Sequence, residues 1–316
     1  MQHARSRSLV YVAALATLAL AVSANRAHAQ AWAGNQGEGE VELGTAFQYS
    51  NTIMWGEQYG RVTGLPAQEV RTHLTVEYTP IDRFTVGATL PFQLNRYSGR
   101  QTGPNPGVIF AHGTNDDGDW HSNFTDLHLD ARYQVLQGDI ALSPIIQVKI
   151  PVSDYENRGY AASGNGLFEV GAGAYIGKLG VFTDNLLVQA GYTFTWVQKE
   201  DGGGEATEAY SMHHSDASLV FGYIFTPSFW AAAGTSLLWT HGGFDLADYP
   251  DADPILKEWH DPIASRRAWS VNVSASYSLT DTLALTPYFG AVLLGKNVSN
   301  AMTGGVNLTW TYLPEP

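Results

Sequence analysis

From about residue 39 onward, polar and apolar side chains alternate one by one along many stretches of the chain. In the clearest stretch, residues 126–133, Asp, His, Asp and Arg alternate with Leu, Leu, Ala and Tyr. Successive side chains of a β-strand point to opposite faces of the sheet. The stretch therefore predicts a strand with one polar face and one apolar face.

The same alternation recurs through the rest of the chain and predicts about twelve strands. Bacterial outer-membrane barrels have an even number of antiparallel strands, each long enough to cross a bilayer at a tilt. We therefore predict an all-β fold, an up-and-down antiparallel transmembrane β-barrel of about twelve strands in a bacterial outer membrane. The predicted strands span residues 39–53, 68–79, 83–96, 124–136, 140–152, 167–177, 185–198, 211–225, 229–241, 265–279, 283–296 and 302–313.

The connections between these strands alternate between short turns and long loops. Short turns at one end and longer loops at the other are typical of outer-membrane barrels, whose short turns are periplasmic. This order predicts that both termini are periplasmic. The predicted long loops span residues 54–67, 97–123, 153–166, 199–210 and 242–264.

The long loops are rich in Gly, Asp, Asn and Pro, as in residues 113–119 and 245–253, and they hold most of the acidic residues. They are predicted to be solvated. The alternative is that they bind divalent cations, which would bridge them to anionic lipid. The run at 115–119 does not match the EF-hand spacing.

The N-terminal segment has the pattern of a secretory signal peptide. Arg5 and Arg7 precede an apolar run at 9–22, and Ala27 to Ala29 match a small-x-small cleavage site. We predict a signal peptide at 1–29 and a barrel domain at 30–316. The alternative, an uncleaved membrane anchor, is disfavoured because a spanning helix needs roughly 20 apolar residues.

Composition narrows the function classes. Only 15% of the residues are charged, the formal net charge is -13, and there is no cysteine. The negative charge argues against nucleic acid as a partner. The closed hydrogen-bond ladder of a barrel would stabilise an exported chain without disulfides. With no Cys, no His-Glu-x-x-His and only a flexible glycine run at 202–204, the sequence predicts no metal site and no cofactor.

Aromatic residues cluster near the ends of the predicted strands. Such rings favour the headgroup level of a membrane, so they are predicted to form girdles against outer-membrane lipid. The alternative is that they fill the core of a soluble β-sandwich. The predicted girdle residues are Tyr133, Trp196, Tyr223, Phe225, Trp230, Trp239, Trp269, Trp310 and Tyr312.

The first half of the chain resembles a known barrel family. The run at 74–92, the segment at 125–133 with the following 146–151, and the glycine-bearing loop at 164–166 are similar to successive hairpins of outer-membrane transporter-type barrels assigned to the meta-pathway of phenol degradation. Beyond about residue 180 only a general barrel pattern remains. The resemblance implies passage of small compounds, including aromatic or hydrophobic ones.

The end of the chain departs from a common barrel ending. Many barrels end on an aromatic residue, whereas residues 313–316 follow Tyr312 here. We therefore expect the barrel-assembly machinery to recognise the internal Trp310 and Tyr312.

The polar faces of the predicted strands carry charges of both signs, which indicates ion pairs across the lumen because unpaired charges in a narrow interior are costly. The leading hypothesis is a porin-like channel for passive transport of small solutes, whose selectivity the lining sets. The alternatives are a plugged, structural barrel and an adhesive barrel whose loops do the work. The predicted lumen residues are Arg71, His73, Glu77, Asp126, His128, Asp130, Arg132, Lys149, Glu169, His214 and Asp216.

An enzyme is a further alternative. His213 and Ser215 lie two residues apart, hence on one strand face, and a serine beside a histidine could be activated to hydrolyse a lipid or ester. No acidic partner is evident on that face. The sequence therefore favours a protein that is not an enzyme, with no catalytic residues.

Overall fold

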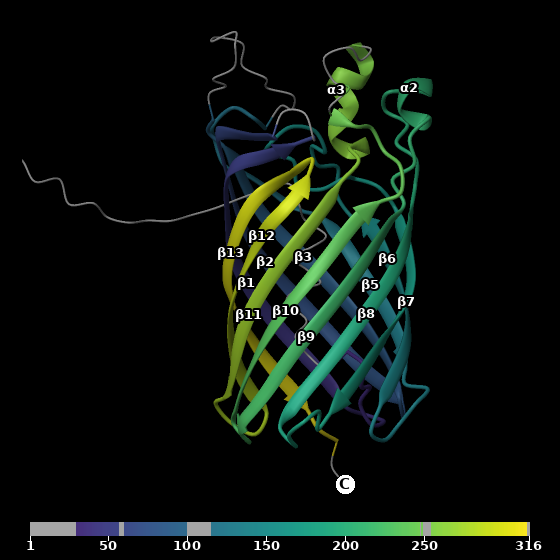
Figure 1. Cartoon of the computed structure of the whole chain (residues 1–316), viewed down its shortest axis with the longest axis vertical. Helices are drawn as coiled ribbons and strands as arrows, with labels where there is room; N and C mark the ends of the chain where they lie inside the picture. Colours follow the sequence, from purple (N-terminus) through teal and green to yellow (C-terminus); the bar gives the residue numbers. More distant parts are fainter. Residues whose placement is uncertain (1–29, 57–59, 100–114, 247, 249–253, 315–316) are drawn as a thin grey trace, which may run out of the picture.

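The computed structural model describes residues 30–56, 60–99, 115–246, 248 and 254–314, which form one closed antiparallel β-sheet (Figure 1). Strand β1 pairs with both β2 and β13 and so closes the ring. Strands β4 and β5 both pair with β3, so they are two parts of one barrel strand. The ring thus has twelve strand positions, and the predicted fold is confirmed. The strands are β1 (Gly39–Trp55), β2 (Gly60–Ile81), β3 (Phe84–Tyr97), β4 (His121–Phe124), β5 (Asp126–Tyr133), β6 (Ala141–Pro151), β7 (Glu169–Leu179), β8 (Leu186–Val197), β9 (His214–Thr226), β10 (Phe229–Thr240), β11 (Arg267–Ser278), β12 (Leu283–Lys296) and β13 (Val298–Tyr312).

The apolar strand faces point outward. On β2, Leu74 and Val76 are 46% and 44% exposed, whereas His73 and Thr75, which alternate with them along the strand, are each 8% exposed. A soluble sandwich would bury the apolar face and expose the polar one, whereas a membrane barrel presents an apolar band to lipid. The sandwich alternative is therefore wrong.

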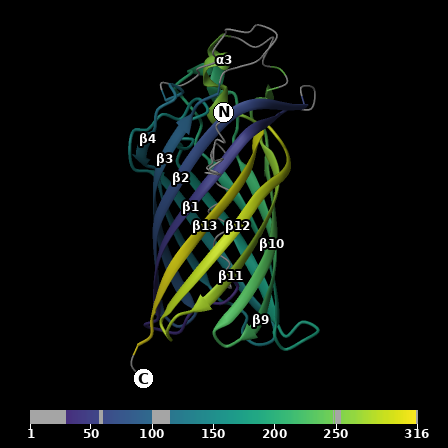
Figure 2. The same ribbon diagram turned by 90° about the vertical axis from the view of Figure 1, so that its left-hand side faces the viewer.

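Two predictions about the outer connections are also wrong. In its described part, the predicted loop at 54–67 continues β1 and β2. Residues 52–55 pair with residues 60–63, and this hairpin reaches past the neighbouring strands (Figure 2). The apolar side chains of this part of the hairpin, such as Leu65, pack against Tyr97 and Ala161 at the outer mouth instead of facing lipid, so the alternation does not reveal it. The predicted loop at 199–210 contains the helix α2 (Glu205–Glu208), and the predicted loop at 242–264 contains the helix α3 (Pro254–Ile263).

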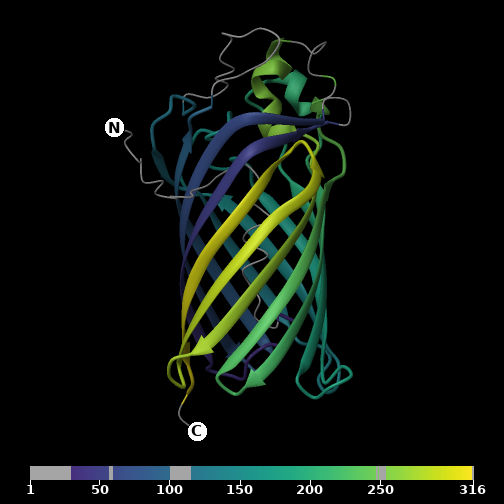
Figure 3. The same ribbon diagram turned by 60° about the vertical axis from the view of Figure 1, so that its left-hand side comes forward.

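These helices are short, and local propensity does not mark them because packing stabilises them. Ile263 at the end of α3 is fully buried in a cluster with Phe244, Val197 and Met212. This cluster covers the outer ends of β8 and β9, and Figures 1 and 3 show both helices at that end of the barrel. Neither described helix is long and apolar enough to cross a bilayer.

The aromatic residues of the strand ends form two groups on the outward face. Trp196, Trp239 and Trp269 are exposed near the long-loop end, and Tyr133, Tyr223, Phe225, Trp310 and Tyr312 are exposed near the short-turn end. One predicted girdle residue differs. Trp230 lies opposite Ile224 and two positions from the buried Ala232, so it belongs to the inward face of β10. That these two aromatic girdles contact lipid stays a prediction.

The loop between β6 and β7 folds into the outer mouth of the barrel. Ser163 is fully buried, and its hydroxyl accepts hydrogen bonds from the amides of Asn95 (2.8 Å) and Asn123 (3.1 Å). The carboxylate of Asp116 accepts the backbone N–H groups of Tyr160 (3.0 Å) and Ala161 (2.8 Å). Asp116 thus holds the inward loop in place, which gives this acidic residue a structural role.

Glycines on the inner face make room for lumen side chains. A Cβ at Gly44 would lie 2.1 Å from the ring of His73, and a Cβ at Gly191 would lie 2.4 Å from the ring of Tyr175. These positions admit no larger side chain without displacement of the ring, because interiors of this density have little spare volume. Local crowding therefore fixes how the lumen is filled.

The first and last described residues lie at the short-turn end of the barrel. The C-terminal strand β13 ends there (Figure 2), and Gly34 accepts a hydrogen bond from the backbone of Arg83 in the short turn between β2 and β3. The predicted signal peptide at 1–29 lies outside the described residues.

Candidate pore lining

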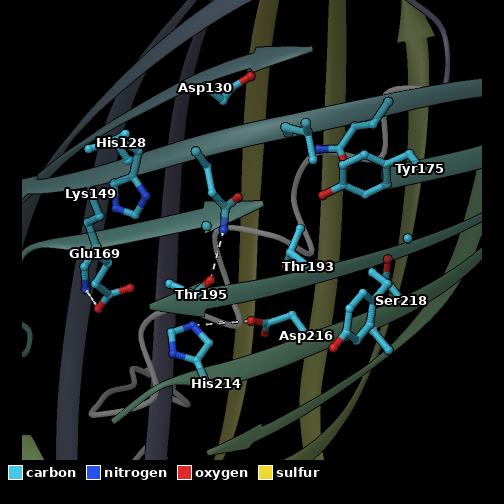
Figure 4. Close-up of a pocket in the computed structure, with 18 of the residues that line it drawn as sticks. His128, Asp130, Lys149, Glu169, Tyr175, Thr193, Thr195, His214, Asp216 and Ser218 are labelled. Carbon is cyan, nitrogen blue, oxygen red and sulfur yellow. Dashed lines mark hydrogen bonds and ion pairs between the residues drawn. The ribbon is translucent and has the colours of Figure 1, made fainter. Parts of the chain in front are cut away.

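The strand register brings charged side chains from three strands to one level of the lumen. Lys149 on β6 is paired with His128 on β5 and with Glu169 on β7. Directly paired residues point to the same face of a sheet. The three side chains therefore meet inside the barrel, as Figure 4 shows.

Lys149 is held between two carboxylates. Its Nζ lies 3.4 Å from Oδ2 of Asp126 and also forms an ion pair with Glu169. The phenol of Tyr155, in the inward-folded loop, donates a hydrogen bond to Oδ1 of Asp126 and accepts one from the backbone N–H of Gly166 (3.0 Å). Burial, followed by the nearby Asp126 charge, raises the pKa of Tyr155. The loop is therefore attached to the strand that carries the Lys149 ion pairs.

Arg132 forms the second ion-pair group. Its guanidinium donates to both carboxylate oxygens of Glu77, at 2.5 and 3.2 Å, and lies 3.8 Å from Asp130. Such two-pronged pairing fixes both side chains and is stronger than a neutral hydrogen bond. Glu77 and Arg132 belong to β2 and β5, so the pair spans the intervening strand β3.

A third group lies where β1 faces β2. The ring Nε2 of His73 lies 3.0 Å from Oε1 of Glu42, and the hydroxyl of Thr309 donates to the other carboxylate oxygen at 3.3 Å. Arg71 on the same strand forms a buried ion pair with Glu69. Glu69 was missed in the sequence analysis, although it stands two residues before Arg71 and so shares its face.

The remaining predicted charges lie on β9. Nε2 of His214 lies 3.4 Å from Oδ2 of Asp216, two residues along the same face. The structure thus places the predicted set on the inner face of the barrel, and their role in permeation stays a prediction. These residues are Arg71, His73, Glu77, Asp126, His128, Asp130, Arg132, Lys149, Glu169, His214 and Asp216.

Two cavities in the described part of the lumen share Lys149 in their lining. The space that the centre of a water molecule can reach is about 130 Å³ in the larger cavity and about 40 Å³ in the smaller one. Glu169, Asp216 and Tyr175 line the larger cavity, and Arg266 lines the smaller one. His128 and Lys149 line both. The two side chains therefore mark the boundary between the cavities, each of which exceeds the space that one water needs.

The first described residues lie inside the barrel at the short-turn end. The backbone N–H of Ala31 donates to Gln189 (2.9 Å), and the hydroxyl of Ser143 donates to the carbonyl of Ala31 (2.7 Å). The N–H of Ala33 donates to Gln134 (3.1 Å). Ala31 is completely buried. Residues 30–33 therefore occupy part of the lumen, and side chains of β6 and β8 hold them there.

The proposed serine–histidine pair is not formed as predicted. Ser215 is fully buried, and its hydroxyl bonds to Nε2 of His241 (2.7 Å) and to the phenol of Tyr192 (2.9 Å). Nδ1 of His213 instead accepts the backbone N–H of Val197 (3.1 Å). The partner of Ser215 lies at the end of the neighbouring strand, which spacing within one strand could not reveal.

The hydrogen bonds of His241 assign the roles of its two ring nitrogens. The indole N–H of Trp239 is only a donor, and it lies 3.1 Å from Nδ1 of His241. Nδ1 is therefore unprotonated, and Nε2 carries the proton and donates to Ser215. A general base would need Nε2 free to accept the serine proton. These hydrogen bonds join Trp239, His241 and Ser215 at the outer rim of the barrel and give them a structural role.

No family model matches the chain, and no curated protein matches it. The resemblance to the meta-pathway family is therefore supported only at the coarser level of outer-membrane barrels, through solved structures.

Solved structures share the fold. The COG4313 outer membrane channel from Pseudomonas putida F1 superimposes with a TM-score of 0.66 at 16% sequence identity, over 90% of this chain and 99% of that chain. The NanC porin matches with a TM-score of 0.49 at 10% identity, over 85% of this chain and 98% of that one. The first of these is an outer membrane channel, and the fold that it shares with this chain agrees with the predicted outer-membrane location.

The matched barrels also correct one conclusion from the sequence. They include the translocator domain of the autotransporter NalP from Neisseria meningitidis (TM-score 0.49, 11% identity, 92% of each chain) and OmpT, an outer membrane protein of Vibrio cholerae (TM-score 0.36, 10% identity, 87% and 98%). A shared fold does not fix a function, so the barrel fold does not exclude an enzyme. The prediction that the chain is not an enzyme is withdrawn.

Proposed function

We propose that the chain is a passive outer-membrane channel for small polar solutes. The observation that carries the proposal is the pair of water-sized cavities in a polar lumen, separated at His128 and Lys149. The ion pairs of Lys149 fix the lining at this boundary. A polar lining with fixed charges sets which solutes pass and which are rejected.

The lining favours polar over hydrophobic solutes. The larger cavity is bordered by carboxylates, hydroxyls and amides, such as Asp216, Thr193 and Gln147. Tyr175 is an aromatic side chain that also lines it, and it offers a surface for a small ring. Passage of small aromatic compounds, which the family resemblance implies, is therefore a narrower proposal that depends on this side chain.

The test is conductance of the purified, folded chain in planar bilayers. A channel predicts discrete current steps in potassium chloride, and small aromatic solutes that enter the lumen would transiently block them. A folded barrel that inserts and carries no current would contradict the proposal and favour the plugged or adhesive barrel. Weaker aromatic block in Tyr175→Ala than in Tyr277→Ala, on the lipid face, would support the aromatic route.

A further inference from the structure

The lumen has two chemically different walls. The Asp, Glu, His, Lys and Arg side chains of the inner face lie on β1 to β9, whereas the inward positions of the described β10 to β13 carry hydroxyls and amides together with apolar residues such as Trp230 and Leu238. On β11, for example, Ser270, Asn272, Ser274 and Ser276 face inward, with Arg267 at the outer end. We call the inner face of β10 to β13 the hydroxyl wall.

Several polar groups of the hydroxyl wall have no partner among the described residues. These are the hydroxyls of Ser236, Ser270 and Ser274 and the side-chain oxygen of Asn307. Buried polar groups are almost always hydrogen-bonded, to protein or to ordered water. Ser236 also lines the larger cavity. The hydroxyl wall therefore borders water-sized space at Ser236, and we infer that water satisfies the other groups and hydrates a route along this wall.

Acidic side chains predominate on the wall opposite. The described strands carry eight inward carboxylates and three inward Lys or Arg side chains, so the strand lining is formally negative with the histidines neutral. Arg266 adds one positive charge at the outer mouth. The carboxylates are Glu40, Glu42, Glu69, Glu77, Asp126, Asp130, Glu169 and Asp216, and the basic residues are Arg71, Arg132 and Lys149.

The positive side chains are screened by their own partners. Arg71 pairs with Glu69, Arg132 with Glu77, and Lys149 with two carboxylates. A mobile ion in the hydrated route therefore experiences each cation together with an adjacent anion. The excess of carboxylates sets the sign of the remaining field, which raises the local concentration of ions of opposite charge.

From this arrangement we propose that the lumen selects small cations, which move along the hydroxyl wall past the acidic wall. This inference rests on the proposed channel function and specifies its substrate class. The proposal predicts that, under a salt gradient across the bilayer, the sign of the reversal potential shows that cations permeate better than anions. Asp216→Asn reduces that potential, and Asp281→Asn, in an exposed turn, leaves it unchanged.

The absence of cysteine in the chain allows a second, independent test. A single cysteine at Ser274 or Ser236 would react with small methanethiosulfonates only if water reaches it. A cationic trimethylammonium reagent should react several-fold faster than an anionic sulfonate reagent of similar size. The matched control is Val273→Cys, because Val273 is 53% exposed on the lipid face and should react with neither reagent in a bilayer.

The outcomes separate the two proposals. Conductance with no cation preference, or with equal labelling by the two reagents, overturns the cation inference and leaves the channel intact. An unlabelled Ser274→Cys in a conducting barrel overturns the hydroxyl-wall route. A folded barrel without conductance contradicts the channel function itself.

Discussion

The phenol of Tyr155 donates its hydrogen bond to Asp126, a carboxylate that also pairs with Lys149. Tyr155 belongs to the inward-folded loop, and Asp126 begins strand β5. The contact therefore links the loop at the outer mouth to the boundary between the two lumen cavities. A change in the loop would alter the side chains at the narrow part of the lumen directly.

Removal of the Tyr155 hydroxyl should loosen this link. In Tyr155→Phe, Asp126 loses one hydrogen bond, and a buried acceptor left without its donor costs roughly 1–3 kcal/mol. We expect more frequent opening fluctuations and a larger mean conductance in single-channel recordings. Tyr277→Phe, whose ring is exposed on the outward face of β11, serves as the control. Identical current traces for Tyr155→Phe and the unmodified chain would refute the link.

Strong alkali should weaken the same link. Burial and Asp126 raise the pKa of Tyr155, whereas a tyrosine in a released loop ionises at about pH 10. Tyr155 therefore binds its proton more tightly in the closed loop than in the released loop. The resulting stabilisation of the closed loop is complete below about pH 10 and declines as the pH rises above that value. Conductance should be constant from neutral pH to about pH 10 and rise above it, and Tyr155→Phe should lose this pH dependence.

Neutralisation of Lys149 should increase cation preference. Lys149→Gln removes the positive charge that lies between Asp126 and Glu169 and leaves both carboxylates at the cavity boundary. The ratio of cation to anion permeability should rise roughly threefold, as expected for a charge seen through a largely aqueous lumen. Lys178→Gln, near the short-turn end of β7, is the control and should leave the reversal potential as it was.

The alternation of residue types was enough to predict the barrel, because a membrane wall imposes it on every crossing strand. It also placed Lys149 and Asp130 on the inner face. It could not reveal the β1–β2 hairpin beyond the wall or helix α3, since neither is constrained by lipid on one side. Strand spans were recovered where both faces are constrained and missed where solvent surrounds the chain.

Contacts between distant segments were beyond the sequence for a different reason. The bond of Ser215 with His241 depends on the register of β9 and β10, and the bond of Tyr155 with Asp126 depends on how a loop folds back. Glu69 is a different case. Its position on the Arg71 face was readable from spacing alone, because residues two apart in a strand share a face.

Removal of the first described residues, which occupy part of the lumen, should widen the short-turn end of the lumen. Residues 30–33 lie inside the barrel through bonds with Ser143, Gln189 and Gln134. A chain that lacks residues 30–32 should show larger single-channel current steps than one beginning at residue 30. Gln189→Ala, which removes the acceptor of the Ala31 N–H, should give an intermediate current. Equal steps in all three would show that the segment does not obstruct ion flow.

Two strand glycines, Gly44 on the inner face and Gly304 on the outward face opposite Phe289, offer a paired test of packing. A Cβ at Gly44 would lie 2.1 Å from the His73 ring, whereas the nearest atom to a Cβ at Gly304 is 4.0 Å away. Gly44→Ala should therefore displace His73 from Glu42 and destabilise the barrel by about 1–3 kcal/mol, the usual effect of overpacking. Gly304→Ala should be tolerated. Urea unfolding followed by tryptophan fluorescence measures both, and equal midpoints would contradict the crowding of His73 against Gly44.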